Sequence, residues 1–326
     1  MKILRGPDSL PASLPAGSVV AVGTFDGVHI GHAAVLAEVV RRAKELGAVP
    51  AAVVFVRPPR VSLPDAAPLD LLTSPEHRLQ LIARLGIELA LDLEFGPKLA
   101  GLSAEEFAGT CLVHGLGARV LIMGHDARLG KGGAGDFPAM KKIGARLGLE
   151  VRQTRRVRAC RQVVSSSAVR RAIQEGRLDI AECLLGRRVS VLGTVVPGLG
   201  HGRELGFPTV NLDIHREVRP PMGVYATLAR VEGGPALKSV SNVGFRPTAT
   251  QSHPRGLRRD LLVEAHLLEG GGDLYGRLVE LEFVKKLREE RRFDSDTELA
   301  AQIALDAEEA RRLLASSSDC RQTRDR

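Results

Sequence analysis

The segment Gly23-Thr24-Phe25-Asp26-Gly27-Val28-His29-Ile30-Gly31-His32 joins an apolar run to an amphipathic one. Residues 18–22 before it have the composition of a buried strand, and residues 33–46 after it repeat apolar side chains at helical spacing. A glycine-rich turn between a strand and a helix aims backbone N–H groups and the positive helix end at an anion. Glycine also lets a phosphate approach the main chain closely. The segment therefore predicts a phosphate-binding turn.

Two histidines flank the end of this turn. His29 and His32 can face the same phosphate if the helix begins between them. Each could then donate a hydrogen bond to a phosphoryl oxygen and stabilise the charge that develops during phosphoryl transfer. The alternative interpretation is that the two histidines merely cap a helix.

The composition is that of a globular protein with small anionic ligands. With 326 residues and 44% apolar content, the chain is long enough for two domains with real cores. It has no run of 18 apolar residues, and its first residues lack the apolar centre of a signal peptide, so we expect a cytoplasmic protein without membrane partners. The four cysteines have no paired short spacings, which indicates neither a zinc site nor a disulfide framework, and we expect them to be reduced.

The charge of the chain leaves two classes of partner open. A net charge of +8 suits phosphorylated substrates, and it also suits nucleic acid. The chain has no Trp, only two Tyr and no alternation of aromatic and basic residues, which disfavours base stacking. A nucleic-acid-binding protein that reuses a nucleotide fold remains the alternative from another class, and it predicts salt-sensitive binding to oligonucleotides. The sequence gives no indication of oligomeric state.

The chain has two halves with different periodicity. Residues 1–184 alternate strand-like and helix-like segments, which is typical of a parallel sheet with helices on both faces, and serine caps are expected before Pro75 and at Ser103. The second half, residues 185–314, begins with a period of two and glycine and proline turns, and it ends with a helical pattern over 295–314. We expect a polar mobile tail over 315–326. The strands expected in the first half are Val19–Val22, Ala51–Phe55, Leu89–Leu93, Val120–Met123 and Glu150–Arg152.

Two further segments could complete the first site. Ser166 and Ser167 stand at a helix start, and Arg170 lies one turn in, where it can reach a phosphate. A plain serine cap is the alternative. Asp126 follows the strand expected at 120–123, where α/β sheets bind their ligands.

Together these segments resemble the nucleotidyltransferase module of bacterial riboflavin kinase/FAD synthetases, whose patterns are G-x-F-D-G-V-H-x-G-H, G-x-D-F-x-F-G and S-S-T-x-I-R. The first pattern matches completely. The resemblance implies a Rossmann-like α/β domain in which the phosphate of FMN attacks the α-phosphorus of ATP, releasing pyrophosphate and making FAD. His29 and His32 would act on the ATP phosphates, and Mg²⁺ would share the charge. The ATP-binding and phosphate-binding residues that it implies are Gly23, Phe25, Asp26, Gly31, Asp126, Ser166, Ser167 and Arg170.

Three departures from these patterns bear on the first half. Pro58 stands where the family has a polar residue, and Val163 stands where an arginine is common, with Arg161 two residues away. Ala127 and Leu129 replace two aromatic residues of the second pattern. These changes predict slow FAD synthesis. In the extreme case the protein would be a riboflavin kinase alone, with the first module as a scaffold.

The second half contains Gly198-Leu199-Gly200-His201-Gly202-Arg203-Glu204-Leu205-Gly206-Phe207-Pro208-Thr209-Val210-Asn211-Leu212. Its glycines form a loop whose amides could wrap a polyphosphate, although a cluster of tight turns would explain them as well. Thr209 and Asn211 alternate on one face of a strand, and their neutral oxygens suit Mg²⁺ and phosphate together. A Walker-type loop is excluded, because no Gly-Lys-Ser/Thr follows.

This segment resembles the riboflavin kinase motif G-x-x-x-G-R-x-L-G-F-P-T-A-N, with Val210 in place of alanine, and further family segments follow in order at 223–226, 241–248, 263–268, 273–276 and 287–293. The resemblance implies a six-stranded antiparallel β-barrel with a C-terminal helix, in which ATP phosphorylates the 5′-hydroxyl of riboflavin. Glu264 would be the general base, and Arg288 and Glu290 would bind the flavin. A solvated glutamate and a surface charge are the alternatives for Glu264 and Arg288. The ATP-binding residues implied are Gly198, Gly202, Arg203, Gly206, Pro208, Thr209 and Asn211, of which Thr209 and Asn211 would also bind the metal.

Overall fold

The computed structural model describes residues 1–10, 14, 16–56, 70–198, 200–214, 217–245, 261–270 and 272–319. The chain divides into two compact units. The first comprises Met1–Val169 with Leu184–Gly186, and the second comprises Arg170–Cys183 with Arg187–Arg326. Of the departures discussed above, Pro58 lies outside the described residues.

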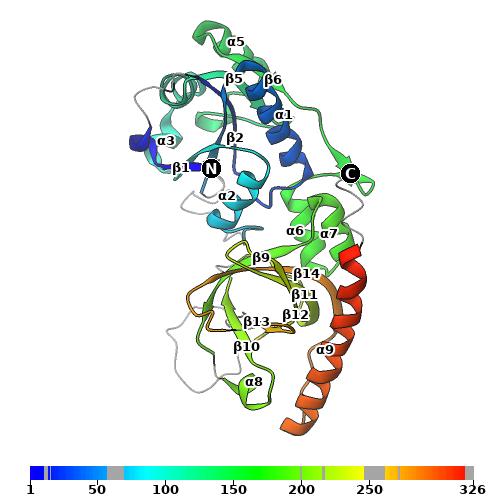
Figure 1. Ribbon diagram of the computed structural model, residues 1–326. Helices are drawn as coiled ribbons and strands as arrows, with labels where there is room; N and C mark the ends of the chain where they lie inside the picture. Colours follow the sequence, from blue (N-terminus) through cyan, green and yellow to red (C-terminus); the bar gives the residue numbers. More distant parts are fainter. Residues whose placement is uncertain are drawn as a thin grey trace. The chain divides into compact units, whose positions relative to one another are not determined.

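The first unit is built on a six-stranded sheet in which every pairing is parallel (Figure 1). The strand order is β1-β4-β3-β2-β5-β6, so β2 lies inside the sheet with β3 on one side and β5 on the other. All five strands expected from the sequence are present, and β1 is an addition. The strands are β1 (Lys2–Arg5), β2 (Ser18–Gly23), β3 (Val49–Phe55), β4 (Leu89–Leu93), β5 (Ala118–Met123) and β6 (Glu150–Gln153).

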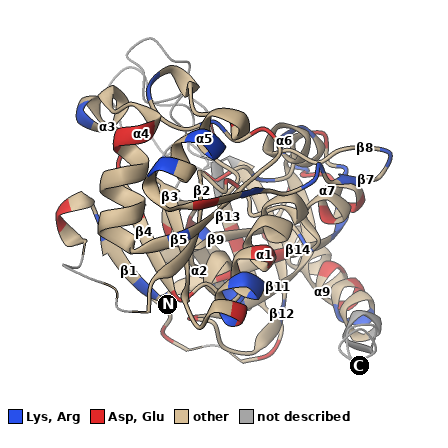
Figure 2. Ribbon diagram, turned by 90° about the horizontal axis from the view of Figure 1, so that it is seen from above, with Lys and Arg blue, Asp and Glu red and all other residues tan. Residues whose placement is uncertain are grey.

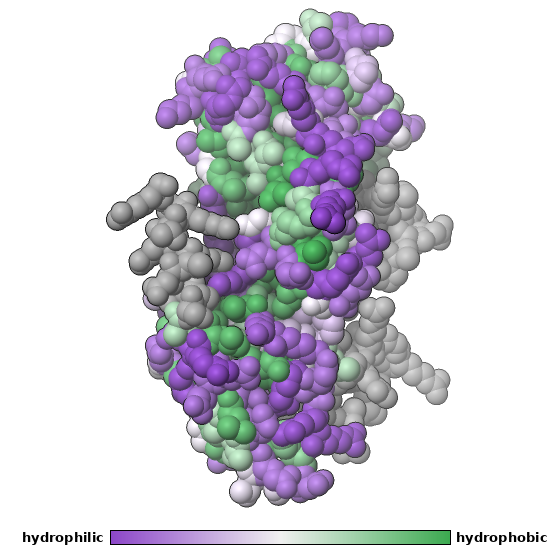
Figure 3. Space-filling view, turned by 90° about the vertical axis from the view of Figure 1, so that its right-hand side faces the viewer, coloured by the Kyte–Doolittle hydropathy of each residue, from purple (hydrophilic) through white to green (hydrophobic). Residues whose placement is uncertain are grey.

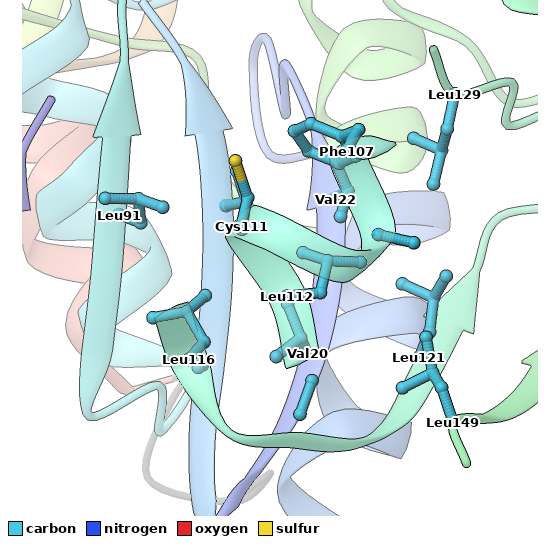
Figure 4. Packing of buried hydrophobic residues seen from close by; sticks show 14 of the residues in the cluster. Val20, Val22, Leu91, Phe107, Cys111, Leu112, Leu116, Leu121, Leu129 and Leu149 are labelled. Atoms are coloured by element: carbon cyan, nitrogen blue, oxygen red, sulfur yellow. The ribbon is translucent and has the colours of Figure 1, made fainter. Parts of the chain in front are cut away.

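Helices cover both faces of this sheet, because alternate residues of each buried strand point to opposite sides. Val20 and Val22 belong to one apolar cluster, and Val19 and Ala21 belong to the other. Figure 4 shows the first cluster, where Leu112 and Leu116 contribute side chains from the helical segment before β5. The helices are α1 (Ile30–Leu46), α2 (Pro75–Arg84), α3 (Pro97–Gly101), α4 (Ala104–Phe107), a π-helical segment (Ala108–Gly115) and α5 (Phe137–Leu147), with short 3-10 turns at Pro7–Ser9 and Lys131–Gly133.

The helix caps expected from the sequence are confirmed. The Ser74 hydroxyl accepts a hydrogen bond from the backbone N–H of His77 at 3.3 Å, directly before the proline that begins α2. Ser103 and Glu106 form a complete capping box, in which each side chain accepts a bond from the backbone N–H of the other residue. These local signals fix where α2 and α4 begin.

The second unit is a closed antiparallel barrel with strand order β10-β13-β12-β11-β14-β9. The six-stranded antiparallel barrel that the resemblance implied is therefore present. Inside the barrel, Tyr225 and Phe283 pack edge to face with their ring centroids 5.3 Å apart. The Thr227 hydroxyl is hydrogen-bonded to those of Ser239 and Ser241 at 2.8 and 2.7 Å. The strands are β9 (Ser190–Val196), β10 (Thr209–Asp213), β11 (Gly223–Val231), β12 (Ala236–Phe245), β13 (Leu261–Leu267) and β14 (Leu278–Arg288).

A long helix covers part of the outside of the barrel. Helix α9 (Asp296–Asp319) buries Ala307, Ala310 and Leu314 against Val224 and Val240 of the barrel wall. The helix continues beyond Leu314 into the segment expected as a tail, and residues 320–326 lie outside the described residues. The remaining elements are the short strands β7 (Arg158–Ala159) and β8 (Gln162–Val163), and the helices α6 (Ser166–Gln174), α7 (Leu178–Leu185) and α8 (His201–Glu204).

Two global expectations can be compared with the structure. None of the described helices is long and apolar enough to cross a membrane, and the face in Figure 3 is dominated by hydrophilic residues. Acidic and basic residues both occur along α9 (Figure 2). Of the cysteines expected to be reduced, Cys111 is a free, buried thiol.

Candidate active sites

The glycine turn of the first unit holds its two histidines against each other. His29 is the N-cap of α1, and its Nδ1 accepts a hydrogen bond from the His32 backbone N–H at 3.2 Å. The two imidazole rings are stacked, with centroids 3.7 Å apart and planes 12° apart. An Nδ1 that accepts is unprotonated, so a neutral His29 carries its proton on Nε2. His29 therefore caps α1 through its Nδ1 atom.

Neighbouring residues leave little freedom in this turn. A Cβ at Gly31 would lie 3.2 Å from the His29 ring, so glycine allows the histidine to lie over the helix start. Phe25 and Val28 have positive φ values of 51° and 38°, a conformation rare for such side chains. Gly23 packs under the Phe25 ring, which a Cβ would approach to 3.3 Å. Backbone strain of this kind is concentrated at functional sites.

Buried Asp26 ties the turn to the start of α2. Its Oδ1 accepts hydrogen bonds from the backbone N–H groups of Leu72 and Thr73 at 2.9 and 3.3 Å. The Thr73 hydroxyl in turn accepts from the Gly27 N–H at 3.1 Å. Ser166, the first residue of α6, donates its hydroxyl to the Asp26 carbonyl at 2.9 Å. The structure thus brings Ser166 to the glycine turn, although the two lie far apart in sequence.

The remaining residues expected in the first site lie at different places. Asp126 follows β5, whose carboxyl end is next to that of β2, and its side chain is exposed beside His125. This is the point of the sheet where the strand order reverses, at which doubly wound sheets bind ligands. Ser167 is exposed, and Arg170 lies one turn further along α6, in the second compact unit. The helix itself is capped by Ser165, whose hydroxyl accepts from the Ala168 N–H at 3.2 Å.

Two of the departures from the family patterns, at positions 127 and 129 and at position 163, lie among the described residues. Ala127 and Leu129 both pack against the apolar cluster under the sheet, Leu129 fully and Ala127 in part. These two positions therefore contribute to packing beneath the segment that follows β5. Val163 is half-buried in β8, and Arg161 stands in the turn before it with a φ of 61°.

In the second unit, register brings three polar side chains into one row. Asn211 of β10 pairs with Glu264 of β13, and Glu264 pairs with Asn242 of β12. Residues paired directly across a ladder share one face of the sheet. Val224, which pairs with Asn242, packs against α9, so the row lies on the outer face of the barrel, on the side that carries α9.

This row lines a pocket of about 450 Å³, within the range typical of small-molecule sites. The glycine loop and α8 form one wall, the barrel strands form the floor, and α9 with the segment after β14 forms another wall. Of the residues expected in the kinase site, Gly202, Thr209, Asn211, Glu264, Arg288 and Glu290 line it; Gly198, Arg203, Gly206 and Pro208 do not. The other lining residues are Gly200, His201, Leu205, Phe207, Val224, Val240, Asn242, Gly244, His266, Arg291, Phe293, Leu299, Ile303 and Asp306.

The glycine loop is packed against the side chains of β10. A Cβ at Gly198 would overlap the Asn211 amide, and a Cβ at Gly202 would lie 3.1 Å from the Thr209 hydroxyl oxygen. Gly198 therefore supports the site although it does not line the pocket. Gly206 has a φ of 86°, which a residue with a side chain rarely adopts. The Arg203 side chain is exposed.

The structure adds Asn242 to the expected residues. The Oδ1 atoms of Asn211 and Asn242 are buried and have no hydrogen-bond partner among the described residues. Buried amide oxygens are normally hydrogen-bonded, so these two atoms point to a ligand on either side of Glu264. Asn242 also donates through Nδ2 to Glu290, at 3.4 Å. The sequence does not single out this residue, because its motif contains several polar positions, whereas the cross-strand pairing with Glu264 does.

Metal binding at this site would depend on neutral oxygens. Within the described part of the chain, no group of three or more His, Cys, Asp or Glu residues could hold a metal ion. Mg²⁺ that is shared with substrate phosphates needs few protein ligands, since waters and phosphate oxygens complete its shell. Thr209 and the buried Asn211 Oδ1 fit that requirement.

Comparisons with known proteins agree with this division of the chain. Residues 12–168 match the family model described as FAD synthetase, and residues 185–314 match that of riboflavin kinase. Bifunctional riboflavin kinase/FMN adenylyltransferases of Escherichia coli K12 and Bacillus subtilis are 37% and 33% identical to this chain over 95% and 93% of its length, and over 97% and 95% of theirs. A crystal structure from Streptococcus pneumoniae, described as a macrolide-efflux protein, has a TM-score of 0.79 and 26% identity, covering 95% of this chain and 98% of its own.

Proposed function

Because the chain belongs to the family of bifunctional riboflavin kinase/FMN adenylyltransferases, we propose that its second unit phosphorylates riboflavin to FMN and its first unit converts FMN to FAD. The row formed by Asn211, Glu264 and Asn242 in the floor of the pocket carries the kinase half of this proposal. ATP is the co-substrate of both steps. We place the boundary of the kinase domain near Leu185, where the riboflavin kinase match begins.

In the kinase step, Glu264 is the general base. Its carboxylate accepts the proton of the riboflavin 5′-hydroxyl as that oxygen attacks the γ-phosphorus of ATP, and ADP leaves. The glycine loop and Thr209 hold the phosphates on one side of Glu264. The flavin ring occupies the wall lined by Arg288 and Phe293, where the guanidinium meets its polar edge.

Mg²⁺ would bind at Thr209 and Asn211. When bound there, the ion supplies positive charge that offsets the charge developing on the transferred phosphoryl group. The buried, unpartnered Oδ1 of Asn211 supports this assignment. Asn242, on the opposite side of Glu264, is assigned to the flavin substrate, whose ribityl hydroxyls can donate to its Oδ1.

In the adenylyltransferase step, an FMN phosphate oxygen attacks the α-phosphorus of ATP, and pyrophosphate leaves. His29 donates from Nε2 to the ATP phosphates, with His32 stacked behind it. Ser166, which lies beside the glycine turn in the same unit, binds the leaving pyrophosphate. Asp26 maintains the turn that orients these groups.

We propose a cytoplasmic enzyme with ATP, riboflavin and FMN as its partners. The test is to incubate the purified protein with riboflavin, ATP and Mg²⁺ and to separate FMN from FAD. Formation of FMN without any FAD would leave a kinase with a scaffold domain. Absence of both products, together with salt-sensitive binding of oligonucleotides, would favour the nucleic-acid alternative.

A further inference from the structure

One wall of the kinase pocket is organised by an ion pair between a barrel strand and the outer helix. Arg288, at the end of β14, donates from Nε to both carboxylate oxygens of Asp306 in α9 at 3.0 and 3.1 Å, and from Nη2 to Oδ2 at 2.8 Å. Its Nη1 donates to the backbone carbonyl of Glu289 at 3.1 Å. All three guanidinium nitrogens are thus engaged, so the plane of the group has a defined orientation.

A second layer of contacts holds the carboxylate itself. Gln302, one turn earlier in α9, donates from Nε2 to Asp306 Oδ1 at 2.8 Å. Its Oε1 accepts from Nη2 of Arg291. Arg291 and Arg288 both lie over the Phe293 ring, at 4.7 and 5.6 Å from its centroid. The five residues therefore form a closed ring of contacts, which we call the α9 clamp.

The position of Asp306 is fixed by the packing of α9. Its side chain is only 5% exposed, compared with 20% for Arg288. The next residue, Ala307, and Ala310 are fully buried against the barrel wall, so the helix cannot move without opening an apolar contact. The clamp thus connects a rigid helix face to an arginine that lines the pocket.

Stability alone is a weak reason for such an arrangement. Removing two charges from water costs about as much free energy as their mutual attraction returns, so an apolar pair would hold the helix as well. A guanidinium with a fixed plane, in contrast, presents its remaining N–H groups to a planar ligand in one geometry. Preorganising a donor in this way removes an ordering cost from binding.

We propose that Asp306 and Gln302 are positioning residues of the kinase site, which hold the Arg288 guanidinium ready for the carbonyl edge of the flavin ring. This inference rests on the proposed contact between Arg288 and the flavin. It makes α9 a part of the riboflavin site. Loosening the clamp should weaken riboflavin binding and leave ATP binding on the glycine loop unchanged.

The test is steady-state kinetics of the full-length protein, with FMN and FAD summed as phosphorylated flavin. Asp306→Asn and Gln302→Leu should raise the KM for riboflavin, by about tenfold for Asp306→Asn because a bond between charged groups is lost. The KM for ATP should stay within about twofold. The double variant Arg288→Met/Asp306→Asn should have the riboflavin KM of Arg288→Met alone, because Asp306 acts through Arg288. Glu308→Gln, an exposed carboxylate on the same helix, is the matched control and should match the wild type.

Three results of these kinetic measurements would bear on the positioning role of Asp306 and Gln302. An unchanged riboflavin KM in folded Asp306→Asn, or effects of Arg288 and Asp306 that multiply in the double variant, overturns the positioning role. If Arg288→Met itself leaves the riboflavin KM unchanged while the kinase remains active, the flavin contact is wrong and the inference fails with it, although the kinase assignment stands. If thermal unfolding shows that Asp306→Asn does not fold, Gln302→Leu, which removes no charge, decides the question by the same KM comparison.

Discussion

Asn211 and Glu264 are direct cross-strand partners in the ladder between β10 and β13. This pairing places the proposed metal ligand and the proposed general base side by side on one face of the barrel. Their separation is set by backbone hydrogen bonds between neighbouring strands, which are among the least mobile parts of a protein. The proposed metal ligand and general base are therefore held by barrel strands, while loops and α9 form the other walls of the pocket.

Glu264→Gln should abolish FMN formation from riboflavin and leave the conversion of FMN to FAD intact. The substitution keeps the size of the side chain and removes the proton acceptor, which typically costs 10²- to 10⁴-fold in rate. Each half-reaction is measured with its own substrate. A kinase rate within about twofold of the wild type would show that Glu264 is not the base.

Asn211→Leu should lower the kinase rate and raise the Mg²⁺ concentration required for half-maximal activity. Loss of one ligand interaction with a charged group corresponds to roughly ten- to hundredfold in rate. Val210→Ala, on the opposite face of β10, is the matched control and should change neither quantity by more than about twofold. An unaltered Mg²⁺ dependence in Asn211→Leu would move the metal away from this residue.

His29→Ala should remove FAD synthesis and spare FMN formation. The wild type itself should accumulate FMN first, because Val163 supplies no charge where the resemblance implies an arginine, and such a contact is worth roughly ten- to hundredfold in rate. Val163→Arg should accelerate FAD formation if Arg161 does not already fill this role. His114→Ala, an exposed histidine in the same unit, serves as the control. Equal rates of the two wild-type steps at saturating substrates would mean that the departures are compensated.

A fragment comprising residues 185–319 should fold and phosphorylate riboflavin, since it contains the whole barrel, the pocket residues and α9. A fragment beginning at Arg170 should have a higher Tm, because helix residues 170–183 belong to the same compact unit and Gly176 lies against Pro221. Thermal unfolding and kinase assays of both fragments check this. Inactivity of the shorter fragment alone would move the domain boundary to the start of the longer one.

Tyr225 should make stability depend on pH in the alkaline range. Burial raises the pKa of its phenol from 10.0 to about 12, with the Glu289 charge acting in the same direction. The folded state therefore favours the protonated phenol, whose stabilising contribution is complete below pH 10 and is lost as the pH rises from 10 toward 12. Urea unfolding at pH 8 and 11 should show a larger loss for the wild type than for Tyr225→Phe. At pH 8 that variant should cost about 1 kcal/mol, because it loses the 2.6 Å bond to the Pro221 carbonyl.

Sequence patterns predicted most of the architecture and several of the residues that line the pocket of the second unit, for physical reasons visible in particular residues. Glycine turns, serine caps and period-two strands are local signals, and the structure places them where the sequence predicted. Strand β1 was missed because it buries only one residue and is recruited by pairing with distant β4. Asn242 and Asp306 were missed because their importance arises from cross-strand register and from a contact between a strand and a helix.

Closure of the barrel has a consequence for association. Among the described strands of the second unit, each has a partner on both sides, so no row of unpaired backbone N–H and C=O groups is left on an edge. Open edges are where other chains add strands and where aggregation begins. An excised barrel should therefore resist edge-to-edge polymerisation even when its loops are lengthened, which makes it a tolerant host for inserted peptides.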